Sequence, residues 1–178
     1  DEVLLSGGYP LSLSTSQLTQ FSDALAHIGH VRRLRIRSRL ARGLPELIDT
    51  EFLSWLRGLP QQAVVVIHAN HANEFDGAVD AALDSLRAAG ATLLNQSVLL
   101  RGVNDDAGTL ADLSRRMFEA GVLPYYLHQL DRVAGAAHFE VDDAEARRLH
   151  AALTATLPGY LVPKLVREVA GEPSKMPL

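Results

Sequence analysis

Short apolar runs alternate with helical patterns along the whole chain. The runs are typical of buried strands and lie at residues 3–8, 33–39, 64–70, 92–100 and 124–130. Between them, apolar residues recur at helical spacing, as in Leu18, Phe21 and Leu25. Repeated strand–helix alternation predicts parallel strands with right-handed crossovers. We therefore expect an α/β fold with about five βα units, forming one partial barrel over residues 1–178.

Capping residues indicate where the helices begin and end. Ser14 or Ser16 can cap the first helix, and Asp142 or Asp143 can cap the last. Thr50 begins a further helix, and glycines at positions 90 and 121 follow two others. The segment YLVPKLVREV then predicts a final extended stretch.

Polar residues gather where the predicted strands end. These strand ends read Ser6-Gly7-Gly8-Tyr9, Arg37-Ser38-Arg39, His68-Ala69-Asn70-His71, Arg101-Gly102-Val103-Asn104-Asp105 and His128-Gln129-Leu130-Asp131. In parallel α/β folds, ligands bind at the carboxyl ends of the strands. The pattern therefore predicts a polar pocket at one rim of the fold.

Several of these residues also have a structural interpretation. His68 and His71 could form a metal pair, but we favour structural or ligand-binding histidines because their spacing is not a diagnostic metal pattern. Arg39 shares a strand face with two other arginines, which indicates either anion binding or a solvated edge. Asp131 could cap a loop, and Lys175 could be an ordinary surface lysine.

Two amides, Asn95 and Gln96, interrupt an otherwise apolar strand. Buried amides must find hydrogen-bond partners, so these two are difficult to assign to the surface. The adjacent glycines Gly7 and Gly8 match neither GxGxxG nor a Walker loop. They predict only a close approach of the backbone to another group.

Composition narrows the class of protein. The 178 residues carry a net charge of -4, which does not favour nucleic-acid or membrane binding, and no apolar stretch approaches the length of a membrane span. No signal peptide is visible, so we expect a cytoplasmic location by default. The chain has no cysteine, which excludes disulfides and cysteine-ligated metal clusters built from these residues alone. Both ends look cut, so we expect a piece of a longer protein.

Several stretches together resemble one enzyme family. LLSGGYPLSLS, HANHANE, LLNQSVLLRGVNDD, LPYYLHQLDRVAGAAHF and GYLVPKLVRE are similar to the lysine 2,3-aminomutase family of radical S-adenosylmethionine (SAM) enzymes. The ending REVAGEPSKMPL is more similar to the branch that makes (R)-β-lysine for elongation factor P. The resemblance implies a radical SAM barrel that isomerises L-α-lysine by amino migration, using pyridoxal 5′-phosphate (PLP), SAM and a [4Fe–4S] cluster.

The resemblance also assigns roles to individual residues. Lys175 matches the lysine that binds PLP covalently, and Asp131 and Glu168 match the acids that hold the ε-ammonium of the substrate. The SAM-site positions are matched by Ser6, Gly7, Gly8, His68 and Gln96, and Arg39 is assigned loosely to an anionic cofactor group. The implied partners are lysine and a ligase that acts on elongation factor P, and an oligomer is allowed.

Departures from the family pattern keep other interpretations open. The CxxxCxxC motif that binds the cluster is missing, so no metal ligand is assigned in this chain and the isolated piece is expected to be inactive. Tyr9 stands where the family usually has Asp, and Ala72 where it has Pro. The alternatives are a free-lysine aminomutase, a glutamate 2,3-aminomutase and a catalytically inactive barrel piece.

Overall fold

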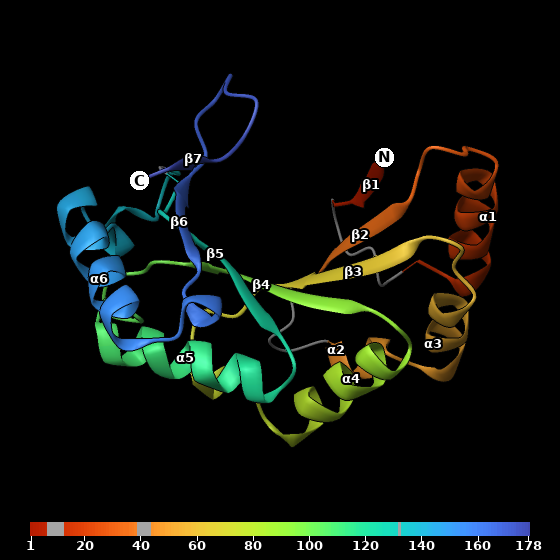
Figure 1. Ribbon diagram of the computed structural model, residues 1–178, viewed down its shortest axis with the longest axis horizontal. Coiled ribbons are helices and arrows are strands. Elements are labelled where there is room, and N and C mark those ends of the chain that lie inside the picture. Colours follow the sequence, from red (N-terminus) through yellow and green to blue (C-terminus); the bar gives the residue numbers. More distant parts are fainter. Residues whose placement is uncertain (7–12, 39–43, 132) are drawn as a thin grey trace. The chain divides into compact units, whose positions relative to one another are not determined.

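The computed structural model describes residues 1–6, 13–38, 44–131 and 133–178 (Figure 1). Its elements in chain order are β1 (Glu2–Leu5), α1 (Thr15–Ala26), β2 (Arg33–Ser38), α2 (Leu44–Leu47), α3 (Thr50–Arg57), β3 (Gln62–Ile67), η2 (Ala72–Glu74), α4 (Gly77–Ala88), β4 (Thr92–Val98), α5 (Ala107–Glu119), β5 (Leu123–His128), η3 (Ala137–Phe139), α6 (Asp143–Thr156), η4 (Gly159–Leu161), β6 (Lys164–Arg167) and β7 (Met176–Pro177). The predicted alternation of strands and helices is confirmed.

The strands follow their order in the chain, from β1 to β7, in one sheet. The described residues cluster into two compact units. The first unit is Asp1–His68, Phe75–Leu94 and Ala120–Val122, and the second is Ala69–Glu74, Asn95–Glu119 and Leu123–Leu178. The prediction of a single domain over the whole chain stays a prediction.

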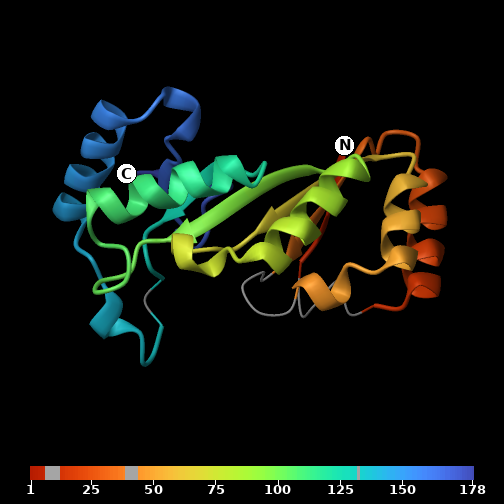
Figure 2. The same cartoon turned by 90° about the horizontal axis from the view of Figure 1, so that it is seen from below.

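The first unit is built on three parallel strands. β1 pairs with β2, and β2 pairs with β3, with Leu34 opposite both Val3 and Ala63. Helices α1 and α3 pack against each other, as both views of the ribbon show (Figures 1 and 2). Trp55 of α3 is buried at this contact and its Nε1 donates to Ser22 Oγ at 3.2 Å.

The second unit carries the C-terminal strands. β5 and β6 are parallel, and β7 returns antiparallel along β6. Helix α5 packs against β5, and α6 packs against β6 and α5. Their apolar sides form a buried core of Leu99, Leu110, Ala111, Leu127, Val141, Ala146, Leu149, Leu153, Leu157, Leu161 and Leu165. This core fixes the strands whose ends carry the predicted substrate residues.

Most of the predicted helix ends are confirmed. Ser14 caps α1 in a capping box with Gln17, and Asp142, rather than Asp143, is the N-cap of α6. Thr50 is the first residue of α3, behind an Asp49 N-cap that the sequence reading had not identified. Helix α2 was also not predicted.

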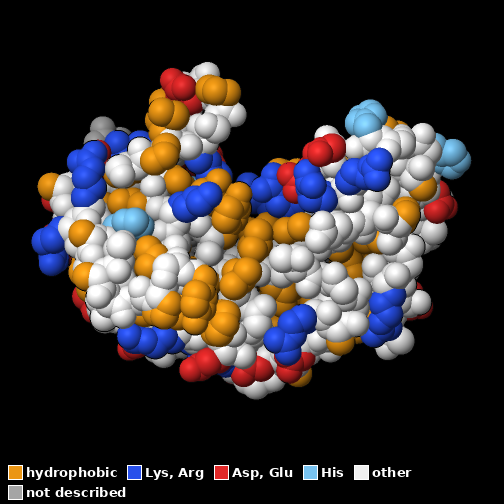
Figure 3. Space-filling model, viewed as in Figure 1, with side chains coloured by type: hydrophobic (Ala, Val, Ile, Leu, Met, Phe, Trp, Pro, Cys, Tyr) orange, Lys and Arg blue, Asp and Glu red, His pale blue; other side chains and the backbone are white. Residues whose placement is uncertain are grey.

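Apolar side chains also reach the surface. Figure 3 shows hydrophobic side chains mostly toward the middle of the face that it presents and charged ones mostly toward its upper and lower edges. In the second unit Phe118 and Tyr160 are both exposed, and their ring centroids lie 5.2 Å apart. Among the described residues, no helix combines the length and apolarity that a membrane crossing would need.

Candidate functional site

The hairpin formed by β6 and β7 places Lys175 beside Glu168. The register pairs Val166 with Pro177 and Arg167 with Met176, so the next facing positions are Glu168 and Lys175. Lys175 Nζ donates to Glu168 Oε1 and forms an ion pair with it. Two residues that are seven apart in the sequence are therefore brought together by strand pairing.

A tight turn sets this register. Glu172 N donates to Val169 O at 3.1 Å, and Gly171 lies between them at a φ of 89°. This left-handed conformation is open to glycine at little cost and is unfavourable for other residues. Gly171 therefore supports the chain reversal that returns Lys175 to the end of β6.

The Lys175 amine also lies near an aromatic ring. Its Nζ is 5.6 Å from the centroid of Tyr126 in β5, and the lysine side chain is 21% exposed. A cation over a tyrosine face is stabilised by the ring quadrupole. The amine is thus partly shielded from water but accessible, as a lysine that captures a carbonyl cofactor must be.

The two predicted substrate carboxylates line one cavity. Its volume is about 340 Å³, and it is lined by Leu130, Asp131, Glu140, Arg167, Glu168, Val169 and Ala170. Asp131 follows β5 and Glu168 follows β6, so neighbouring strands deliver the two acids. Glu140 adds a third carboxylate, which the sequence did not predict. A cavity rich in carboxylates suits a cationic ligand.

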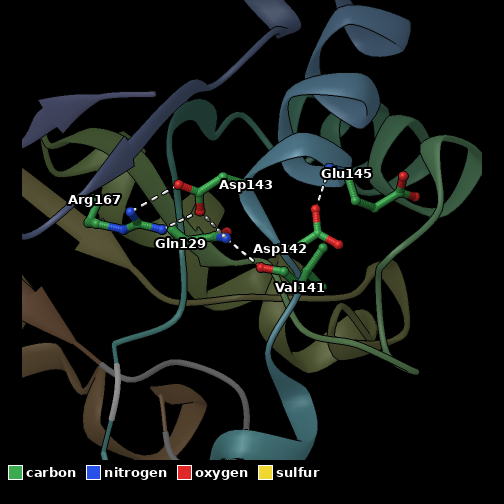
Figure 4. Close-up of polar contacts among 6 residues, drawn as sticks. All are labelled: Gln129, Val141, Asp142, Asp143, Glu145 and Arg167. Carbon is green, nitrogen blue, oxygen red and sulfur yellow. Dashed lines mark hydrogen bonds and ion pairs between the residues drawn. The ribbon is translucent and has the colours of Figure 1, made fainter.

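Arg167, a cation in this lining, is bound by Asp143 at the start of α6 (Figure 4). Arg167 Nη1 donates to Asp143 Oδ2 at 3.1 Å, and Nη2 donates to Oδ1. Gln129 Nε2 donates to Asp143 Oδ1 at 3.2 Å and also to Val141 O. The hydrogen bond from Arg167 lowers the pKa of Asp143 and keeps its carboxyl ionised.

Buried amides hold the chain at the carboxyl end of β3. Asn95 Oδ1 accepts from Ala69 N at 2.8 Å, and Asn95 Nδ2 donates to Ala69 O at 3.0 Å. Asn70 Oδ1 accepts from Val98 N at 2.7 Å, while Asn104 Nδ2 donates to Asn70 O at 2.9 Å. The structure therefore gives Asn95 a scaffolding role, which satisfies the hydrogen-bonding requirement noted from the sequence.

The turn after these residues is held by an acid. Glu74 Oε1 accepts from Asn70 N at 2.6 Å and from His71 N at 2.9 Å. His71 Nδ1 in turn accepts from Asn73 N at 3.1 Å. The roles of Asn70, Glu74 and Asn104 were not predicted, although polar residues clustered after a strand are the signal that could have indicated them.

The residues assigned to SAM are divided between the two units. Ser6, after β1, is exposed and His68, after β3, is half-buried, and both belong to the first unit. Gln96 of β4 is 3% exposed and belongs to the second unit. Gly7, Gly8, Tyr9 and Arg39 lie outside the described residues. The SAM assignments stay predictions.

The other two arginines of the predicted strand face, Arg35 and Arg37, lie in β2 and have interaction partners. Arg35 Nη2 lies 3.1 Å from Glu2 Oε2 across the β1–β2 pair, and Arg37 is not without an interaction partner. Arg33 at the start of the strand is paired with Asp1 at 2.7 Å. Glu2 therefore neutralises Arg35 within the chain, so this arginine of the predicted strand face does not require a bound anion.

The residues of this chain fit one of the cofactors that the resemblance implies and lack the ligands for another. Lys175, with its shielded amine beside Tyr126, fits PLP. The described residues contain no group of three or more His, Cys, Asp or Glu that could hold a metal ion, and the sequence has no cysteine. These 178 residues therefore supply no thiolate for a [4Fe–4S] cluster.

Two solved structures have a similar fold, and one of them is named a radical SAM methyltransferase. A domain of a pyruvate-formate lyase-activating enzyme from Bacteroides vulgatus matches 94% of this chain and 98% of its own, with a TM-score of 0.58 and 13% identity. A radical SAM methyltransferase from Sphaerobacter thermophilus matches 75% of this chain and 40% of its own, with a TM-score of 0.54 and 17% identity. The predicted α/β fold of the radical SAM type is confirmed.

Sequence comparison defines the family more narrowly. The chain is 51% identical over 178 residues to L-lysine 2,3-aminomutase of Escherichia coli and 49% identical over 175 residues to that of Haemophilus influenzae. It is 35% identical over 177 residues to the L-lysine 2,3-aminomutase of Clostridium subterminale. No family model matches the chain.

The chain spans about half the length of these curated relatives, 52% for the first two and 42% for the third. Over that half the match is continuous, because it covers 98% or more of this chain in each case. The resemblance read from the sequence is confirmed, and the chain is homologous to this part of the lysine 2,3-aminomutases.

Proposed function

We propose that the whole protein converts L-α-lysine to (R)-β-lysine by a PLP- and SAM-dependent 1,2-amino migration. The observation that carries this proposal is the cavity lined by Asp131 and Glu168, with Lys175 beside Glu168. Relatives that match this chain end to end are named L-lysine 2,3-aminomutase. The name of these relatives and the carboxylates of the cavity both support an amino acid with a cationic side chain as the substrate.

Two acids of the cavity and two residues near it have separate roles in this proposal. Asp131 and Glu168 bind the ε-ammonium of lysine, Glu168 by exchanging its ion pair with Lys175 for one with the substrate. The two contacts fix the distance between that end and the reacting amino group. Lys175 would hold PLP, which supplies a carbonyl that captures an amine and a conjugated ring that delocalises an unpaired electron. The Tyr126 ring excludes water from one side of the Lys175 amine.

The charge of the cavity favours lysine over glutamate as the substrate. Two carboxylates attract an ammonium at the end of a side chain and repel a carboxylate at the same place. The glutamate 2,3-aminomutase alternative therefore requires a partner for the substrate carboxylate. Arg167, the one cation among the described residues that line this cavity, is already paired with Asp143.

The substrate assignment is tested on the full-length protein supplied with PLP, SAM and a reductant. We expect β-lysine from L-lysine and no β-glutamate from L-glutamate, measured by chiral chromatography. Asp131→Asn and Glu168→Gln should raise KM for lysine by about tenfold or more, because each removes a charge-assisted contact. Product from glutamate, with none from lysine, would overturn the proposal.

We further propose that this β-lysine modifies elongation factor P. The ending GEPSKMPL, with a single glycine before the lysine, supports this branch over the free-lysine enzymes. Cells that produce the protein together with the ligase should carry a β-lysyl group on elongation factor P, located by peptide mass spectrometry and distinguished from the isomeric α-lysyl group by chiral chromatography after hydrolysis. Free β-lysine accumulating while elongation factor P stays unmodified would favour the free-lysine alternative.

A further inference from the structure

Arg167 is a cation at a place where the proposed substrate requires negative charge. It directly precedes Glu168 in the chain and lines the same cavity as Asp131 and Glu140. A guanidinium stays protonated at all working pH values, so it cannot lose its charge by titration. Unless another group offsets it, this charge would repel an incoming ammonium.

Asp143 supplies the offsetting charge. Both of its carboxylate oxygens accept from Arg167, in the two-point geometry that suits a guanidinium and a carboxylate. The pair joins the start of α6 to the end of β6 across 24 positions in the sequence. Its two side chains are 38% and 37% exposed, so part of the pair is shielded from solvent.

Capping does not account for Asp143. The N-cap of α6 is Asp142, whose Oδ1 accepts from Glu145 N at 2.9 Å (Figure 4). Asp143 is the first residue inside the helix, and its carboxylate accepts hydrogen bonds from Arg167 and from the buried amide of Gln129. The two adjacent acids thus have different roles: Asp142 caps the helix, and Asp143 pairs with Arg167.

We infer that Asp143 is a positioning residue that holds and neutralises Arg167 at the rim of the cavity lined by Asp131 and Glu168, and so keeps the cavity selective for a cationic substrate. This inference rests on the proposed function. Gln129, which is 4% exposed, orients the Asp143 carboxylate from the buried side. Asp143 itself acts through Arg167 and is not assigned a contact with the substrate.

The experiment compares binding of two ligands to full-length protein without SAM, where no turnover occurs. The ligands are L-lysine and L-norleucine, which has the same carbon chain without the ε-ammonium, and their Kd values are measured by calorimetry. Asp143→Asn should weaken lysine binding roughly tenfold and leave norleucine binding unchanged. A merely structural role would weaken both ligands alike, and this result would overturn the inference.

Two further variants provide the internal controls. The double variant Asp143→Asn/Arg167→Gln should recover the lysine affinity, because it removes the charge that Asp143 offsets. Asp112→Asn, which breaks the exposed 3.0 Å pair with Arg115 on α5, should leave both affinities unchanged. Failure of the double variant to recover lysine binding would contradict the inference.

Kinetics and folding separate the remaining outcomes. With lysine as substrate, Asp143→Asn should raise KM about tenfold with little change in kcat. If Asp143→Asn does not fold, Arg167→Gln is tested alone: it leaves the Asp143 charge unopposed, so lysine should bind at least as tightly as to wild type, and weaker lysine binding would overturn the inference. A wild-type protein that neither binds nor isomerises lysine would contradict the proposed function, whereas an active wild type with an unaffected Asp143→Asn would contradict only the role of Asp143.

Discussion

A single polar side chain in an apolar strand can be structurally essential, as Asn95 shows. It is 1% exposed and bonds both backbone groups of Ala69, with a further hydrogen bond to Ser97 Oγ at 2.8 Å. An alanine at this position would leave buried donors and acceptors without partners. The amide thus determines how the chain leaves β3.

We expect Asn95→Ala to lower the free energy of unfolding by about 2–3 kcal/mol, the cost of leaving buried polar groups unsatisfied. The measurement is urea unfolding followed by circular dichroism. Asn73→Ala is the matched control, since the Asn73 side chain is exposed, and should change stability by less than about 0.5 kcal/mol. Equal losses in the two variants would contradict the scaffolding role of Asn95.

The lysine that holds PLP can be identified directly. Borohydride reduction of PLP-loaded full-length protein should attach the cofactor irreversibly to a peptide that contains Lys175, located by mass spectrometry. Lys164 on β6 is exposed and serves as the internal comparison. Label confined to the Lys164 peptide would contradict the assignment of Lys175.

Residue types alone indicated which side chains needed partners but not which partners they have. Asn95 could be recognised as an amide in an apolar strand, yet Ala69 lies 26 positions away and is reached only through the fold. The same holds for Arg167, whose acid lies on another element. Long-range pairs of this kind depend on topology, which local periodicity does not encode.

At the scale of elements, the length of the turn between β6 and β7 determines which residue lies opposite Glu168. Successive residues of a strand point to opposite faces, so a shift of one position reverses the face of every following side chain. The register that pairs Arg167 with Met176 therefore keeps Lys175 on the side of Glu168.

Inserting one glycine after Gly171 should move Lys175 out of register and abolish lysine isomerisation by the full-length protein. The thermal unfolding midpoint should change little, because β7 is only two residues long and exposed. An equal insertion after Gly29, in an exposed turn of the first unit, should leave activity intact. Activity that survives the insertion at Gly171 would show that strand register does not position the lysine.

Helices such as α5 were predictable because apolar residues recur at helical spacing over many residues, and buried strands such as β3 because they form a continuous apolar run. The short elements were not. α2 has four residues and β7 has two, too few to show a period. The sequence therefore predicted the β6–β7 hairpin only as an extended segment followed by a family motif.

At the scale of the whole molecule, charged pairs make stability depend on pH. Arg167 lowers the pKa of the Asp143 carboxyl, and hydrogen bonds from Thr109 lower that of Asp106. A carboxyl whose pKa is lower in the folded state stabilises the fold above its unfolded pKa, and this contribution is lost as the pH falls through the folded pKa.

The free energy of unfolding of the chain should accordingly be level from about pH 7 to pH 5 and fall between about pH 4 and pH 2. Asp143→Asn should make this decline shallower by less than about 1 kcal/mol, since its pair with Arg167 is more than a third exposed. Denaturant titrations at several pH values provide the measurement. A decline identical to wild type would show that the pair adds nothing to stability.

The division into two units could not be read from the sequence, because one α/β pattern runs through both. Segments of each unit are interleaved along the chain, so no change in composition marks a boundary. By contrast, the fold class and the pair of acids followed from strand-end chemistry and family motifs. Strand periodicity by itself could not bring Asp131 and Glu168 to one cavity, because that depends on β5 lying beside β6; only the family resemblance indicated that the two acids act together.

The Asp143–Arg167 pair also has an evolutionary consequence. A chain that lost only the acid would carry an unbalanced cation beside its substrate, and a chain that lost only the arginine would leave a carboxylate at the helix start without its partner. The two positions should therefore change together in related proteins, either kept as a pair or replaced as a pair. Descendants of this chain would reach a new substrate charge more readily by passing through the double replacement than by losing the aspartate first.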